Sequence, residues 1–68
     1  MIIYLNGEER HLDPSATVSS VLAELALARQ DRGVAVAVNA EVVPKSEWGR
    51  TTLTAGDRVE VLIAVQGG

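Results

Sequence analysis

Residues 58–68 have the sequence RVEVLIAVQGG, a strand pattern that passes directly into two glycines. Successive side chains of a strand point to opposite faces of its sheet, so the valines and the isoleucine at the odd positions share one face. The even positions place Leu62 and Ala64 together on the opposite face. We expect a strand over residues 58–65 that lies near the centre of a sheet.

Two hairpins are expected ahead of this strand. Residues 1–12 (MIIYLNGEERHL) contain Asn6-Gly7, a pair typical of a type I′ turn between two strands. The return strand, Glu8–Leu12, is polar and is expected at a sheet edge, where charge discourages pairing with other chains. Residues 34–43 (VAVAVNAEVV) alternate valine and alanine and then turn at Asn39-Ala40. This pattern predicts a strand, a turn and a short second strand.

One helix is expected between the two hairpins. Apolar residues recur there at the spacing of a helical face: Val18, Val21, Leu22 and Leu25. The helix is predicted to span roughly Val18–Ala28, with Ser15 or Thr17 as its N-cap. A further short helical turn is expected near Ser46–Trp48, with Trp48 covering one end of the core. The order of elements predicts an α+β fold, a mixed four- to five-stranded sheet packed on one helix.

One sheet face is expected to remain open, because a single helix cannot cover both faces. Small and apolar side chains are predicted on this open face: Tyr4, Ala35, Ala37, Leu62 and Ala64. An exposed apolar face suggests a site for a partner protein. Scattered alanines on an exposed sheet also occur without any binding role, so the pattern alone leaves both interpretations open.

Composition and charge exclude several classes of function. The net charge is −3 and the pI about 4.9, whereas proteins that bind nucleic-acid backbones are usually basic. The chain has no cysteine and one histidine, His11, which argues against disulfides and metal sites and leaves no thiol to carry sulfur. No apolar run is long enough to span a membrane, and no signal-peptide pattern is present. We expect a cytoplasmic protein with no nucleic-acid or membrane partner.

The last residues are predicted to form a flexible tail, residues 66–68, after a domain of residues 1–65. Extended, Gln66-Gly67-Gly68 would reach about 10 Å beyond the fold. Glycines lack a Cβ and can enter a channel that side chains would block. The one group that such a tail can deliver is its carboxylate, which needs activation, for example as a mixed anhydride with a nucleotide phosphate. Since the sequence has no phosphate-binding glycine loop, a partner enzyme must activate it. The alternative is a frayed end without function.

The whole chain resembles the ThiS family of small sulfur-carrier proteins, within the ThiS/MoaD ubiquitin-like group. The most specific segments are VNAEVVPKSEW at residues 38–48 and GDRVEVLIAVQGG at residues 56–68. The opening MIIYLNGEE and the helix TVSSVLAEL also match. The resemblance implies a β-grasp fold, with Gly68 as the reactive end and Gly67 as its neighbour. It also implies that the open sheet face, with Val65 and Gln66, contacts partner proteins.

The resemblance further implies a reaction sequence in which this chain is a protein cosubstrate and not an enzyme. A ThiF-like adenylating enzyme would use ATP to activate the Gly68 carboxylate, so the chain itself would bind no cofactor. Sulfur from a donor such as a cysteine desulfurase would then give a thiocarboxylate. A ThiG-like thiazole synthase would receive that sulfur for thiamine biosynthesis. The alternatives are a sulfur carrier for molybdopterin synthesis and a ubiquitin-like modifier or interaction module.

Overall fold

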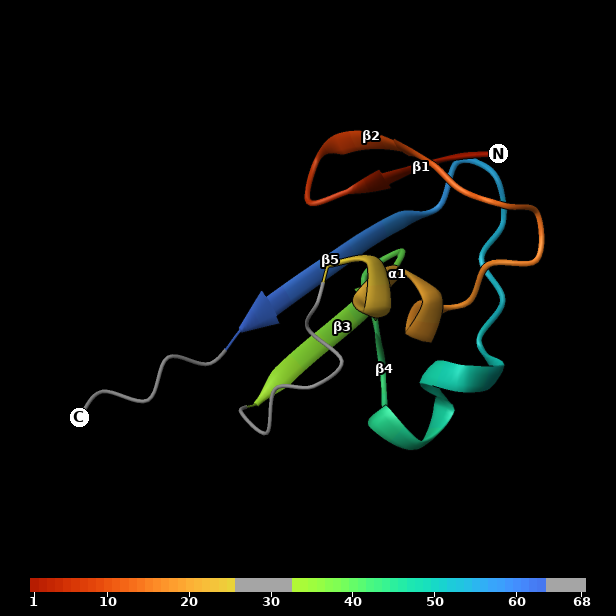
Figure 1. The fold of residues 1–68 in the computed structure, drawn as a ribbon. Helices are drawn as coiled ribbons and strands as arrows, with labels where there is room; N and C mark the ends of the chain where they lie inside the picture. Colours follow the sequence, from red (N-terminus) through yellow and green to blue (C-terminus); the bar gives the residue numbers. More distant parts are fainter. Residues whose placement is uncertain (26–32, 64–68) are drawn as a thin grey trace.

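The fold is a single mixed sheet with one helix packed on it, seen in a computed structural model that describes residues 1–25 and 33–63. The strands are β1 (Ile2–Leu5), β2 (Glu8–His11), β3 (Val34–Val38), β4 (Glu41–Val43) and β5 (Arg58–Ile63). The helices are α1 (Val18–Glu24) and the 3₁₀ helix η1 (Lys45–Arg50). The predicted order of elements is confirmed (Figure 1).

The five strands are arranged in the order β2-β1-β5-β3-β4. β5 pairs in parallel with β1 and antiparallel with β3, while the two hairpins β1-β2 and β3-β4 are antiparallel. β5 therefore occupies the centre of the sheet, as its sequence predicted, and the charged strand β2 forms one edge. The expected extension of β5 to residue 65 lies outside the described residues.

Both hairpins turn through residues with positive φ. Asn6 and Gly7 have φ values of 50° and 86°, and Asn39 and Ala40 have values of 51° and 69°. Positive φ at both central positions is the geometry of a type I′ turn, whose twist matches that of the flanking strands. The turn prediction at Asn6-Gly7 is confirmed. Ala40 is the costlier residue, because its Cβ crowds the backbone in this conformation.

Replacing Ala40 with glycine is expected to stabilise the protein. Removing the strain of Ala40 at positive φ should raise the free energy of unfolding by about 1–2 kcal/mol. The greater flexibility of glycine in the unfolded chain lowers this gain by about 0.4–1 kcal/mol. We expect a net gain of about 0.5–1 kcal/mol and a melting temperature about 4 °C higher. Ala55→Gly is the control, since Ala55 is exposed and has no positive φ. If both variants melt at the same temperature, the strain assigned to Ala40 is wrong.

Helix α1 begins at a reciprocal cap. The Thr17 hydroxyl accepts a hydrogen bond from the Ser20 N–H at 3.3 Å, and the Ser20 hydroxyl accepts one from the Thr17 N–H at 3.1 Å. Of the two predicted cap residues, Thr17 is therefore the one used. α1 ends at Glu24, and Leu25 is its C-cap. Leu25, which was predicted inside the helix, therefore lies just after it. The remainder of the predicted helix, residues 26–28, lies outside them.

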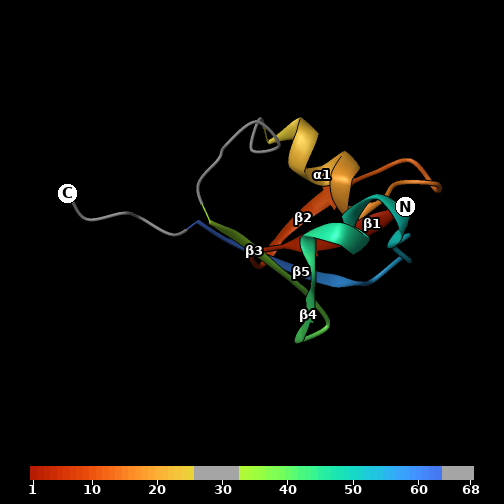
Figure 2. The ribbon, with the colours of Figure 1, turned by 90° about the horizontal axis from the view of Figure 1, so that it is seen from below.

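The core lies between α1 and one face of the sheet, as Figure 2 shows. Its buried members are Ile3, Leu5, Val18, Val21, Leu22, Val36, Leu53, Val59 and Val61. Trp48 is half-buried against this core, and its indole N–H donates to the Val43 carbonyl at 2.9 Å, which confirms its predicted place. Leu53 enters from a loop, held by a hydrogen bond from its N–H to the Ala16 carbonyl at 2.9 Å.

Within residues 1–25 and 33–63, no helix has the length and apolar character needed to cross a membrane.

Candidate partner-binding face

The sheet has one surface that no described helix covers, which we call the outer face; it lies opposite α1 (Figure 2). Its residues follow from strand alternation and from the pairing register: Ile2, Tyr4, Glu9, His11, Ala35, Ala37, Val42, Arg58, Glu60 and Leu62. The side chains of Leu62 and Val42 are 66% and 73% exposed. Exposed aliphatic side chains of this size on one sheet face are a candidate contact surface for another protein.

One end of the outer face is apolar. Leu62 on β5 pairs with Ala35 on β3, and Ala37 on β3 pairs with Val42 on β4. The small alanine side chains leave the larger side chains standing above the sheet, where a partner can pack against them. We call the surface of these four residues the apolar patch.

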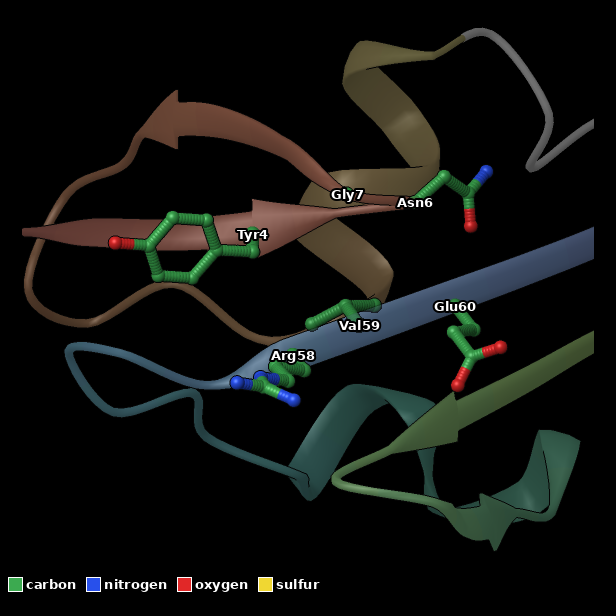
Figure 3. Close-up of a pocket in the computed structure, with 6 residues that line it drawn as sticks. All are labelled: Tyr4, Asn6, Gly7, Arg58, Val59 and Glu60. Atoms are coloured by element: carbon green, nitrogen blue, oxygen red, sulfur yellow. The ribbon is translucent and has the colours of Figure 1, made fainter.

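The other end of the outer face is hollowed and polar. A shallow hollow of about 680 Å³ is lined by Tyr4, Asn6, Gly7, Arg58, Val59 and Glu60. Figure 3 shows the Tyr4 ring lying over β1 with the Arg58 side chain on β5 nearby, while Glu60 lies further along β5. Tyr4 and Arg58 are paired across the two strands. An aromatic ring paired with a cation, with a carboxylate further along the same hollow, offers both apolar and charged contacts to a partner protein.

The structure places four of the predicted site residues on the same face of the sheet. Tyr4, Ala35 and Leu62 are exposed, Ala37 is half-buried, and all four lie on the outer face, as expected. Their role in binding a partner stays a prediction. The other five predicted site residues lie outside the described residues: Ala64, Val65, Gln66, Gly67 and Gly68.

Sequence reasoning missed three contributors to this face. Val42 is predicted only as part of a short strand, and Arg58 only as the start of another. Strand alternation could have placed Arg58 on the same face as Leu62, whereas the position of Val42 opposite Ala37 depends on the pairing register. Asn6 was assigned only to its turn. Its side-chain amide also binds the backbone of β5, a contact between residues that are 55 positions apart in the chain. No local sequence pattern signals such a contact.

The described residues offer no constellation suited to metal chemistry. Within residues 1–25 and 33–63, no group of three His, Cys, Asp or Glu side chains is close enough to hold a metal ion. His11 is exposed on the edge strand β2. Asp57 serves the turn before β5, since its carboxylate accepts hydrogen bonds from the Thr54 N–H at 2.8 Å and from the Asn39 amide at 3.1 Å.

A mixed five-stranded sheet in this order, packed on one helix and open on its outer face, defines a β-grasp domain of the ubiquitin-like type. The sequence profile of the ThiS family matches residues 3–68, and the chain belongs to the ThiS family. The predicted fold and family are thereby confirmed.

Solved structures agree with this assignment. The crystal structure of the thiamine biosynthesis protein ThiS from Geobacter metallireducens superposes with a TM-score of 0.80, at 33% identity over the full length of both chains. An NMR solution structure of a thiamine biosynthesis protein from the same organism gives a TM-score of 0.79 at 34% identity. That match covers 100% of this chain and 88% of the other.

A curated relative is much longer. A thiazole synthase from Paramagnetospirillum magneticum is 40% identical to this chain over 68 residues, which is 100% of this chain. The chain spans 20% of the length of that protein. A region similar to this whole chain therefore occurs within a larger polypeptide that is named for thiazole synthesis.

Proposed function

We propose that this chain is a sulfur carrier that donates sulfur for the formation of the thiazole ring in thiamine biosynthesis. The observation that carries the proposal is the ThiS-family match, which runs to Gly68 and so includes the two terminal glycines. The similarity to two thiamine biosynthesis structures and to a thiazole synthase supports the same pathway. None of these comparisons names molybdopterin synthesis, the alternative pathway to which the sulfur could go.

The proposed chemistry takes place at the Gly68 carboxylate. One of its oxygens attacks the α-phosphorus of ATP on a ThiF-like adenylating enzyme, pyrophosphate leaves, and an acyl adenylate forms. The terminal sulfur of a persulfide, supplied by a donor such as a cysteine desulfurase, attacks the acyl carbon and displaces AMP. A second thiol then cleaves the S–S bond and leaves the thiocarboxylate. The chain is a cytoplasmic cosubstrate in this scheme, with no cofactor of its own.

The proposed recipient of the sulfur is a ThiG-like thiazole synthase. A region resembling this chain lies within one polypeptide named thiazole synthase, which supports direct contact between carrier and synthase. Joining two partners in one chain turns their encounter into an intramolecular one, at an effective concentration reaching the millimolar range for short linkers.

Genetic complementation tests the choice of recipient. The chain is expressed in a bacterial strain that lacks its own ThiS protein and needs added thiazole to grow. We expect growth without thiazole, and no growth when the expressed chain lacks Gly68. A chain that is produced and folded in these cells but does not restore growth, while it restores a strain lacking the molybdopterin carrier, would contradict the thiazole assignment.

The outer face is proposed to dock on the partner enzymes, and Leu62→Glu is expected to weaken that docking. Leu62 is 66% exposed, so the charge should change stability by less than about 0.5 kcal/mol. In the complex, the carboxylate would be buried against apolar surface without a partner, and we expect the dissociation constant to rise at least about tenfold. Isothermal titration calorimetry with purified thiazole synthase measures it.

Ala23→Glu is the matched control for Leu62→Glu. Ala23 is exposed on α1, on the opposite side of the domain from the outer face, and the variant adds the same charge. We expect its dissociation constant to equal that of the wild type. Equal weakening by both variants would indicate a general charge effect and would remove the outer face from the binding surface.

A further inference from the structure

Strand β1 ends before β5 does. The pairing of the two strands reaches Leu5 and Val59, after which the chain turns away at Asn6 with a φ of 50°. β5 continues to Ile63, and β3 accompanies its other edge as far as the Val34–Ile63 pair. The N–H and C=O groups on the β1 side of β5 therefore need another partner beyond Val59, since unpaired backbone groups are costly.

The side chain of Asn6 supplies that partner. Its Oδ1 accepts a hydrogen bond from the Val61 N–H at 2.9 Å, and its Nδ2 donates to the Val61 carbonyl at 3.3 Å. The backbone N–H of Asn6 also donates to the Val59 carbonyl at 2.9 Å. One residue thus extends the β1–β5 ladder by a step after β1 itself has ended, and it fixes β5 just ahead of Ile63, the last described residue.

A second asparagine holds the opposite end of β5 in a similar way. Asn39 also has a positive φ, of 51°, in a hairpin turn. Its Oδ1 accepts from the Arg58 N–H at 3.0 Å, and its own N–H donates to the Arg58 carbonyl at 2.7 Å. Asn39 therefore offers a comparison of the same residue type and turn geometry, with a contact of the same kind to the residue at which β5 begins. Its Nδ2 differs in donating to the Asp57 carboxylate at 3.1 Å.

We infer that Asn6 is a positioning residue for the reaction at Gly68, which holds the end of β5 in a fixed relation to the outer face. The inference rests on the proposed function. When the outer face docks on the adenylating enzyme, the hydrogen bonds at Val61 keep the end of β5 fixed relative to the docked face, and the residues that follow Ile63 start from that fixed point. Orientation of this kind governs how often a reacting group arrives in a productive geometry. Without the Asn6 amide, we expect the chain still to dock on the enzyme, but the Gly68 carboxylate to reach a reactive orientation in the active site less often.

Asn6→Gly removes the amide and keeps the backbone conformation, because glycine adopts a positive φ readily and Gly-Gly suits this turn. The direct readout is amide hydrogen exchange followed by NMR. We expect the Val61 amide to exchange about tenfold faster in Asn6→Gly, while the core amides of Leu22 and Val36 keep their wild-type rates. In Asn39→Gly, the Val61 amide should exchange as in the wild type. Unchanged exchange of Val61 in Asn6→Gly would overturn the inference.

The functional readout is ATP–pyrophosphate exchange catalysed by the ThiF-like adenylating enzyme of the same organism, measured against carrier concentration. We expect kcat to fall about tenfold in Asn6→Gly with KM within about twofold of wild type, and both constants to stay near wild type in Asn39→Gly. A partly unfolded variant would behave differently, since a smaller folded fraction raises the apparent KM and leaves kcat unchanged at saturation.

The possible failures are distinguishable. Equal kcat values for Asn6→Gly and wild type, or equal losses in Asn6→Gly and Asn39→Gly, overturn the positioning role of Asn6 and leave the sulfur-carrier proposal standing. A wild-type chain that supports no pyrophosphate exchange overturns the proposed adenylation, and the positioning role with it, before any variant is compared.

Discussion

Deletion of Gly68 is expected to abolish sulfur loading and to leave the fold unchanged. The deletion variant still ends in a carboxylate, that of Gly67. Its tail is one residue shorter, so the carboxylate cannot extend as far from the domain. One residue of extended chain spans about 3.3–3.6 Å, and a displacement of even 1 Å at a reacting centre can cost about a hundredfold in rate. We expect thiocarboxylate formation to fall by at least about a hundredfold, as measured by mass spectrometry after incubation with ATP, the adenylating enzyme and a sulfur donor.

The melting temperature is the control for this deletion. The buried core described above is formed by residues between Ile3 and Val61, so we expect the deletion variant to melt within about 2 °C of the wild type. A deletion variant that is loaded with sulfur at the wild-type rate would contradict the assignment of Gly68 as the reactive end. Sulfur would then be loaded on the Gly67 carboxylate equally well, and the length of the tail would not matter for the reaction.

Leu22→Ala is expected to remove a large part of the protein's free energy of unfolding. Leu22 is 1% exposed and packs in the core between α1 and the sheet. Truncating a buried leucine to alanine costs about 2–5 kcal/mol, and a domain of this size has about 3–10 kcal/mol of stability in total. We expect the midpoint of urea denaturation to fall by half or more, as followed by circular dichroism.

Leu62→Ala is the matched control, because the same side-chain atoms are removed at a position that is 66% exposed. We expect it to change the free energy of unfolding by less than about 0.5 kcal/mol. Similar losses in the two leucine variants would mean that the outer face is covered within the chain itself, and the partner-binding assignment would fail.

Most of the fold follows from short-range signals in the sequence. The Asn6-Gly7 turn, the helical spacing of Val18, Val21 and Leu22, and the alternation in residues 34–38 each depend on neighbouring residues, and the structure confirms all three. The alternation also predicted which side chains of β3 and β5 lie on the outer face, because strand geometry fixes that choice once one face is buried.

The contacts that sequence reasoning missed join residues far apart in the chain. The Asn6 amide binds Val61, and Leu53 packs into the core from a loop without regular pattern. Neither contact leaves a periodic trace, since each depends on where the folded chain brings two segments together. Leu25 was also expected inside α1, because it continues the apolar spacing past Glu24, whereas it is the C-cap of the helix.

The measurement that tests the central claim most directly is the intact mass of the protein purified from its own cells, before and after treatment with a thiol-alkylating reagent. A thiocarboxylate replaces one oxygen by sulfur, a mass change that oxidation of Met1 nearly matches, but the chain has no cysteine and only the thiocarboxylate would be alkylated. We predict an alkylated species whose fragmentation places the adduct on Gly68. A chain with an unmodified carboxylate, which stays unalkylated even after incubation with ATP, a sulfur donor and cell extract, would contradict the sulfur-carrier account.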